Sequence, residues 1–403
     1  MNLKIFTENI EEAARSQIYE LLAQPAFKDA KVRIMPDTHA GAGCVIGFTA
    51  DLGDKVIPNV VGVDINCGVR VVELGKADID LPALDSFIKS SIPAGFAVNA
   101  RQQAPFDLDR LRCRDSLLNP NRLLLGIGSL GGGNHFIEVD EDADGNKYLV
   151  IHTGSRNLGL QVAKLYQEKA IAHCRENPLK DIRAKLISDL KAQGREREIQ
   201  AELAKLSASL PAPNIPDQLC YIEGSDREDY LHDMAVCGEY AELNRRIIAS
   251  RIVAFLGAEP IREWESVHNY IDESNMVRKG AIAAHKGQMA IIPLNMRDGS
   301  LICVGKGNPE WNESAPHGAG RLLSRSAARR TLSVEDFTKS MEGIYTTTAD
   351  ESTIDESPMA YKDADEIASL IGDTVEIIRR IRPIYNFKAS DAERVWAQKG
   401  EGE

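Results

Sequence analysis

Six histidines lie beside glycine, asparagine or aspartate, in segments predicted to be loops or strand ends. They are His39, His135, His152, His268, His285 and His317. The chain has only eight histidines, and the other two, His173 and His232, lie in segments predicted to be helical. Loops carried by a rigid scaffold are where binding and catalytic sites are built. One such histidine is usually an ordinary polar residue, but six of eight indicate a site that uses imidazole.

Cys67 has the most suggestive setting of any cysteine. It lies three residues after Asp64, in segment 61–68, which starts like a strand and turns at Gly68. The two side chains could therefore face one point. A thiolate, a carboxylate and several imidazoles form a ligand set for a divalent metal ion; cysteine with three histidines suggests zinc, and the carboxylate leaves room for manganese. The alternative is an inert, buried Cys67, since free cysteine is often buried.

The densest glycine run, residues 126–135, is a candidate phosphate-binding loop. Such a loop lets backbone N–H groups approach phosphate oxygens closely. It has neither the Gly-Lys-Ser/Thr of a Walker A loop nor the spacing of a Rossmann fingerprint. A tight structural turn is an equal alternative.

His317 lies in a second glycine-rich segment, 316–321, which leads into a predicted helix at 322–330. The first N–H groups of a helix favour negative charge, and a histidine there could attack the α-phosphate of a nucleotide to form a phosphoramidate. Arginine suits bidentate phosphate contacts. The helix region carries Arg321, Arg325, Arg329 and Arg330. The alternative is a solvated basic helix face.

A second basic cluster lies near the C-terminus. It contains Arg379, Arg380, Arg382 and Lys388, interleaved with Tyr385 and Phe387. Cations beside rings that can stack suit a nucleotide or the end of a nucleic acid.

The composition, 43% hydrophobic and 27% charged among 403 residues, is typical of a soluble globular protein. Seven irregularly spaced cysteines without a CxxC pair predict a reducing, cytoplasmic compartment. The first 23 residues are acidic and amphipathic, unlike a signal peptide, and no apolar stretch reaches the roughly 18 residues of a membrane span. The net charge of −12 disfavours a protein that coats nucleic acid but permits a local basic groove.

The scaffold that positions these residues is predicted to mix strands and helices. Strands are expected at 31–35, 43–50 and 69–74, and in the region 265–307. Helices are expected at 80–90, 227–256, 321–330, 333–341 and 364–381. Asp80 would cap the first of these, with Pro82 in its first turn.

The charged, Leu- and Ala-rich sequence from about 160 to 210 predicts a helical pair, 164–175 and 181–207, ended by Pro211 and Pro213. Its charge pattern indicates exposed faces. We therefore predict a single compact α+β domain over residues 1–403, with central β-structure. The helical pair would be a peripheral insertion, and residues 389–403 a tail.

In their order along the chain, these segments resemble the RtcB family of RNA ligases. The matching stretches are 35–41 (MPDTHAG), 61–68, 128–138, 152–156 (HTGSR), 268–269, 278–281 (RKGA), 291–293, 317–321 (HGAGR), 355–358 (DESP), 361–363 (YKD) and Lys388. They span almost the whole chain. Each is a modest match by itself, but their order and joint presence are highly specific.

The resemblance implies a site with two manganese ions and GTP. Cys67 would bridge the ions, and the remaining ligands would be Asp64, His135, His152 and His268. His317 would be the guanylylated nucleophile, with Asp37 and His39 in supporting roles. The resemblance further implies nucleotide contacts from Asn134 to phosphate, from Glu138, Ser300 and Lys388 to guanine, and from Asn295, Gly318, Ala319 and Gly320. At Asn295 relatives often carry serine, and His285 has no counterpart in the pattern.

The implied reaction joins an RNA 3′-phosphate or 2′,3′-cyclic phosphate end to a 5′-hydroxyl end. GTP would guanylylate His317, GMP would pass to the RNA 3′-phosphate, and the 5′-hydroxyl would displace GMP. The role would be RNA repair or tRNA splicing, with RNA ends and GTP as partners, no membrane, and the need for an activating protein left open.

Two other functions are compatible with parts of the sequence. A metal-dependent phosphoesterase would use Asp64, Cys67 and the histidines to activate water, but it gives His317 no role. An RNA-binding or structural metalloprotein is disfavoured by the acidic net charge and by the absence of a recognisable RNA-binding module.

Overall fold

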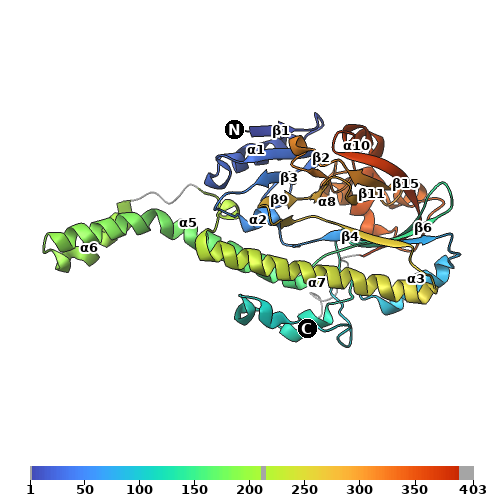
Figure 1. The fold of residues 1–403 in the computed structure, drawn as a ribbon, viewed down its shortest axis with the longest axis horizontal. Helices are drawn as coiled ribbons and strands as arrows, with labels where there is room; N and C mark the ends of the chain where they lie inside the picture. The colour runs from blue at the N-terminus through green and yellow to red at the C-terminus, as the bar shows by residue number, and fades with distance from the viewer. Residues whose placement is uncertain (1, 210–214, 390–403) are drawn as a thin grey trace.

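The computed structural model describes residues 2–209 and 215–389. Pro211 and Pro213, expected to end the helical pair, and the tail after Ala389 lie outside the described residues. Strands within these ranges form three sheets, and helices pack around them (Figure 1). The predicted α+β class, with central β-structure, is confirmed.

The largest sheet has the order β11-β12-β15-β5-β6-β4-β7, all antiparallel, with β14 parallel to β15. The two edge strands of this sheet, β11 and β7, lie next to each other, since the Ile291 N–H on β11 donates to Ser266 Oγ on β7 at 2.9 Å. The sheet therefore nearly closes on itself. The bounds are Gly68–Gly75 (β4), Phe136–Glu141 (β5), Lys147–Thr153 (β6), Arg262–Val267 (β7), Met289–Asn295 (β11), Gly299–Gly305 (β12), Tyr345–Thr346 (β14) and Val375–Lys388 (β15).

A second sheet has the order β1-β2-β3-β9-β8, in which only β1 and β2 are parallel. Its bounds are Asn2–Ile5 (β1), Lys31–His39 (β2), Ile46–Asp51 (β3), Tyr270–Ile271 (β8) and Met276–Lys279 (β9). A small antiparallel pair, β10 (Ala281–Ala283) and β13 (Ser314–Pro316), leads directly into His317.

The helices are Glu12–Leu22 (α1), Pro58–Val61 (α2), Leu81–Ser91 (α3), Pro120–Leu125 (α4), Arg156–Ala192 (α5), Ile199–Ser209 (α6), Gly224–Leu256 (α7), Arg325–Thr331 (α8), Val334–Ser340 (α9) and Ala364–Leu370 (α10). Short 3-10 segments are Pro25–Phe27, Leu108–Arg110, Arg114–Ser116, Glu196–Glu198, Asp217–Leu219, Pro309–Trp311, Glu351–Glu356 (η7) and Pro358–Ala360. No helix of the described ranges has the length and apolar character needed to cross a bilayer.

The long helix α7 runs along the large sheet (Figure 1) and helps to build the site. Its buried residues recur every three or four positions, which is the spacing of one helix face packed on a core. From that face, the buried Arg245 donates to the backbone oxygens of Asn66 and Thr153, at 2.9 and 3.0 Å. It also pairs with Glu265 at 2.8 Å. Arg245 thus ties together three segments that border Cys67.

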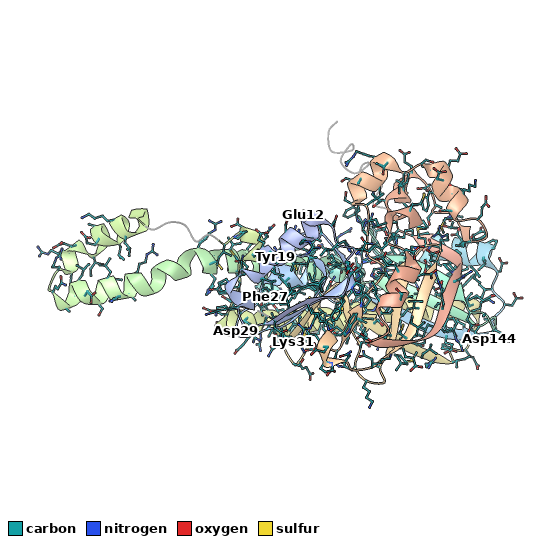
Figure 2. The ribbon with its side chains drawn as sticks, turned by 90° about the horizontal axis from the view of Figure 1, so that it is seen from above. Glu12, Tyr19, Phe27, Asp29, Lys31 and Asp144 are labelled. Carbon is teal, nitrogen blue, oxygen red and sulfur yellow. The ribbon has the colours of Figure 1, made fainter. Side chains whose placement is uncertain are left out.

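The outer part of α5 and helix α6 extend away from the rest of the molecule in both views (Figures 1 and 2). The predicted helical pair is therefore present, but its break was placed wrongly. Helix α5 continues through the expected gap at 176–180, and the chain turns around Gly194, whose φ of +70° suits glycine.

Two further helix predictions were wrong in part. The expected helix at 364–381 ends at Leu370, and residues from Val375 onward form β15. Helix α8 begins at Arg325 rather than at 321 or 322, with Ser324 as its N-cap, because Leu322 and Leu323 instead donate their N–H groups to the Ala360 oxygen.

Most other elements lie where the sequence predicts them. Helix α3 has the expected cap, since Asp80 accepts the Ala83 N–H at 3.0 Å. Helices α7 and α9 and strand β4 match the predicted segments within a few residues. Strand β2 continues four residues beyond the expected end, to His39, and so carries Asp37 to the edge of the site.

Candidate active site

A cavity of about 870 Å³ lies where the two larger sheets meet. Most of the predicted site residues line it: His39, Asp64, Cys67, Asn134, Glu138, His152, His268, Asn295, His317, Gly318, Ala319, Gly320 and Lys388. Asp37, His135 and Ser300 lie behind its wall and are buried. Histidines 173, 232 and 285 lie elsewhere, and His285 pairs with Glu313 on the surface.

The order of the large sheet brings the candidate metal ligands together. Cys67 directly precedes β4, His135 directly precedes β5, His152 lies near the end of β6, and His268 directly follows β7. Because these strands are antiparallel neighbours in the order β5-β6-β4-β7, the four residues gather at one edge. Two groups result, Cys67 with His152 and His268, and Cys67 with Asp64 and His135, each with ligand atoms within 4.8 Å of one another.

Backbone carbonyls fix two of these imidazole rings. His135 Nδ1 lies 2.8 Å from the Leu130 oxygen and His152 Nδ1 lies 3.1 Å from the Asn134 oxygen. Because a carbonyl only accepts, each Nδ1 must carry a proton. Nε2 of the two rings lies 3.5 Å and 3.2 Å from Cys67 Sγ, and Nε2 of His135 also lies 2.9 Å from Asp64 Oδ2. Carbonyl contacts of this kind at Nδ1 are typical of histidines that bind a metal ion.

Two histidines of the cluster are neutral, as metal ligands must be. Burial lowers the pKa of His152 and His268 well below the usual value, so both rings are neutral at pH 7. Burial, followed by the charge of Asp64, raises the pKa of the Cys67 thiol. Although burial alone would raise it, His135 brings the pKa of Asp64 down to about 2. The donor set, together with a His268 Nδ1 that has no partner among the described residues, fits divalent cations.

His317 is held by Asp37. The fully buried Asp37 accepts from Nδ1 of His317 at 2.7 Å and from its backbone N–H at 3.1 Å. Asp37 thereby fixes a ring proton on Nδ1, and Nε2 is the nitrogen that remains for a nucleophilic role. The ring centroid lies 4.8 Å from that of His268, so His317 borders the cysteine–histidine cluster. The geometry is that of a nucleophilic imidazole oriented by a carboxylate.

The loop after His317 must approach β2 closely. Gly320 has a φ of +78°, and an added Cβ would lie 2.2 Å from the Asp37 backbone oxygen. The expected helix dipole does not act on His317, since α8 begins only at Arg325 and is seven residues long. His39 contacts the Asp37 oxygen through Nδ1 at 2.9 Å, and burial lowers its pKa to about 4.

The other end of the cavity is built by β5 and β15. Lys388, the last residue of β15, pairs in register with Phe136, and its ammonium lies 5.1 Å from the centre of that ring. Its Nζ donates to the Asn134 oxygen at 3.1 Å and pairs with Glu356 at 2.9 Å. Burial raises the pKa of the nearby Glu138, whereas Lys388 and Asn386 oppose that rise.

Asn295 and Ser300, both predicted to contact the nucleotide, do not present their side chains freely to the cavity. Asn295 lines the cavity, but its side chain is engaged in a turn: Oδ1 accepts from Arg297 and Asp298 N–H at 3.0 and 2.9 Å, and Nδ2 donates to Asp298 at 2.8 Å. Ser300 is fully buried on β12, with no partner for Oγ in the described part of the chain.

The expected basic helix face is largely neutralised. Arg325 and Arg329 pair with Asp355 at 3.2 and 2.9 Å. Arg321 pairs with Glu356 at 3.2 Å. Sequence reasoning assigned no role to these two carboxylates, although the segment 355–358 was among the matching stretches and was the available signal.

The two other predicted clusters have mainly structural roles. In the glycine run, Asn244 Oδ1 takes the N–H groups of Gly128 and Ser129 at 2.7 and 3.1 Å, so that part is a tight turn. In the C-terminal basic cluster, both aromatic side chains, Tyr385 and Phe387, are buried. Its arginines 379 and 380 pair with Asp142 and Asp365, which leaves Lys388 at the cavity.

Comparisons with known proteins agree with this geometry. A family model described as tRNA-splicing ligase RtcB matches residues 17–119 and 113–389. The RNA-splicing ligase RtcB of Escherichia coli K12 is 29% identical over 430 residues, which cover 96% of this chain and 97% of that protein. The tRNA-splicing ligases RtcB of Aeropyrum pernix and Pyrobaculum aerophilum are each 28% identical, over 457 and 450 residues, covering 87% of this chain and 86% of each protein.

The matched residues include the cysteine–histidine cluster, His317 and Lys388, and they make up most of the chain. The chain therefore belongs to the RtcB family.

Proposed function

We propose that this protein is an RNA ligase that uses GTP and manganese to join a 3′-phosphate or 2′,3′-cyclic phosphate end to a 5′-hydroxyl end. The observation that carries the proposal is His317, with Nδ1 bound to buried Asp37 and its ring beside the cysteine–histidine cluster. A phosphoesterase that activates water on a metal ion would use the cysteine–histidine cluster and would leave His317 without an assigned role. The names of the relatives, RNA-splicing and tRNA-splicing ligases, support the same reaction class.

The first step is attack of His317 Nε2 on the α-phosphorus of GTP. A nitrogen–phosphorus bond forms, the bond to the bridging oxygen breaks, and pyrophosphate leaves. The proton stays on Nδ1 of His317 throughout this step. Asp37 accepts its hydrogen bond and stabilises the positive charge that develops on the ring, as carboxylates do for catalytic histidines. A cyclic phosphate end must first be opened by water to a 3′-phosphate.

In the later steps, an oxygen of the RNA 3′-phosphate attacks the phosphorus on His317, which releases the imidazole and gives a GMP-activated RNA end. The 5′-hydroxyl oxygen then attacks the RNA 3′-phosphorus, the phosphoanhydride bond to GMP breaks, and GMP leaves while the hydroxyl proton passes to the departing phosphate. Bound manganese, held by Asp64, Cys67, His135, His152 and His268, would supply charge neutralisation for the phosphates. In this proposal Cys67 is shared, because it belongs to both ligand groups.

Nucleotide recognition is assigned to residues that line the same cavity. Glu138 and Lys388 would contact guanine, and Asn134 and Gly318–Gly320 would border the phosphates, since all of them line the cavity. Ser300 could contribute only if the wall in front of it moved. A reducing compartment, the cytoplasm, fits the seven cysteines, all described, buried and free of disulfides. The proposed role is RNA repair or tRNA splicing.

The decisive experiment is incubation with α-³²P-GTP and Mn²⁺, followed by a denaturing gel. We expect a covalent label on wild type that is lost in His317→Ala and Cys67→Ala. His285→Ala is the matched control, because this histidine is exposed and its ring pairs with Glu313 on the surface. An unlabelled but folded, metal-loaded wild type that hydrolyses phosphate esters would favour the phosphoesterase instead.

A further inference from the structure

Glu356 is the last residue of η7 and one of the most buried carboxylates of the cavity wall, with 2% of its side chain exposed. It accepts from four donors in three parts of the chain, 321–325, Tyr361 and Lys388. Oε1 lies 3.2 Å from Arg321 and 3.1 Å from Arg325. Oε2 lies 2.7 Å from the Tyr361 hydroxyl and 2.9 Å from Lys388 Nζ.

The two oxygens of Glu356 face different functional parts of the cavity. Oε1 holds arginines in and after the loop that begins at His317, on the phosphate side. Oε2 holds Lys388, on the guanine side. All three cations line the cavity together with Glu356 itself. One carboxylate therefore fixes the distance between the two halves of the proposed nucleotide site.

The charge of Glu356 is secure at neutral pH. Burial alone would raise its pKa, but the charges of Lys388, Arg325 and Arg321 lower that pKa to about 2. The Lys388 ammonium has three N–H donors, of which Glu356 and Asn134 take two. The direction of the third donor is thereby set. Without the carboxylate, the Lys388 ammonium would lose its counter-charge and its fixed orientation. Lys388, Arg321 and Arg325 would then repel one another.

We infer that Glu356 is a positioning residue that aims Lys388 at the base of the nucleotide and so sets the preference for guanine over adenine. Guanine presents an oxygen acceptor at its C6 position, where adenine presents an amino donor. An ammonium held in one direction distinguishes the two, whereas a mobile ammonium does not. The inference rests on the proposed function, because it takes GTP as the nucleotide.

The test compares Glu356→Gln with Asp355→Asn. Asp355 is adjacent and equally buried, with 2% of its side chain exposed, and it pairs with arginines but not with Lys388. The readouts are the half-saturating GTP concentration for labelling, the labelling rate at saturation, and competition by ATP. Since hydrogen bonds to charged groups are worth about 1.5–3 kcal/mol, we expect a roughly tenfold or larger loss of discrimination in Glu356→Gln. Its rate at saturation should stay within about threefold of wild type.

Asp355→Asn should keep the discrimination of wild type. A Lys388→Ala/Glu356→Gln double variant should be no less selective than Lys388→Ala, since Glu356 acts through the lysine. Equal losses in both single carboxylate variants, or full discrimination in Glu356→Gln, would overturn the inference. If Glu356→Gln does not fold, Glu356→Asp replaces it, and unchanged discrimination there would overturn it too. A wild type that GTP never labels would instead count against the proposed function.

Discussion

At the end of the cavity near Cys67, neutral imidazoles and a buried thiol present lone pairs to one another. At the end near Glu356, buried carboxylates are already matched by a lysine and three arginines. The first arrangement offers donor atoms to a cation, whereas in the second the carboxylates Glu356 and Asp355 already have cationic partners. We infer that the first end performs chemistry and that the second holds the substrate in place.

This contrast is tested most strongly at Asp37, which serves the chemical end. Asp37→Asn keeps the shape but allows the Nδ1/Nε2 tautomer of His317 to change. The labelling rate at saturating GTP should fall about 10²- to 10⁴-fold, as expected when a catalytic histidine loses its orienting carboxylate. The half-saturating GTP concentration, measured in the same assay, should change little.

The control for this variant is Asp355→Asn, which alters a carboxylate at the other end of the cavity. Its labelling rate should stay close to that of wild type. A large fall in nucleotide affinity for Asp37→Asn, with the labelling rate preserved, would contradict the inference that one end performs the chemistry and the other holds the substrate.

The second prediction concerns stability and belongs to the positioning end. Glu356→Gln removes one partner of a buried ion-pair network, in which Lys388 and Glu356 are 5% and 2% exposed, and should cost about 3–5 kcal/mol of unfolding free energy at pH 7. The carboxylate has a folded-state pKa of about 2, below the unfolded value of about 4.3. Its contribution is therefore full above about pH 4.3 and is lost as the pH falls toward 2.

Urea unfolding at pH 7, 4 and 3 checks both parts of this expectation. The difference in unfolding free energy between wild type and Glu356→Gln should become smaller from pH 7 to pH 3. The reason is that wild type loses the ion pair as Glu356 is protonated, whereas glutamine does not titrate. A gap that is constant from pH 7 to pH 3 would mean that the loss comes from packing rather than from charge.

Local sequence signals predicted the parts of the molecule whose contacts are local. The Asp80 cap and helix α9 depend on neighbours within a few residues, and both lie where expected. The first part of strand β15 was wrongly predicted as helix, although its Val- and Ile-rich sequence favours a strand. Pairing with β12 and β5, which are distant in the chain, holds it as a strand.

The two ends of the site also differ in how well the sequence predicted their residues. At the chemical end, residue type and setting singled out Cys67 and six histidines as candidates, and of these six only His285 lies away from the site. At the positioning end, Glu356 carries no such signal. Its four donors come from three parts of the chain, and its role exists only once the fold has brought them together.

The smallest effect is expected at Asn295, which lines the cavity between the two ends. Serine, with one hydroxyl, can replace only part of the three hydrogen bonds that Asn295 makes within its turn. Asn295→Ser should therefore cost about 0.5–1.5 kcal/mol of unfolding free energy and change the half-saturating GTP concentration less than twofold. Both are measured with the assays above. A tenfold change in that concentration, without loss of stability, would show that Asn295 leaves its turn to bind the nucleotide, so that the wall between the two ends takes part in recognition.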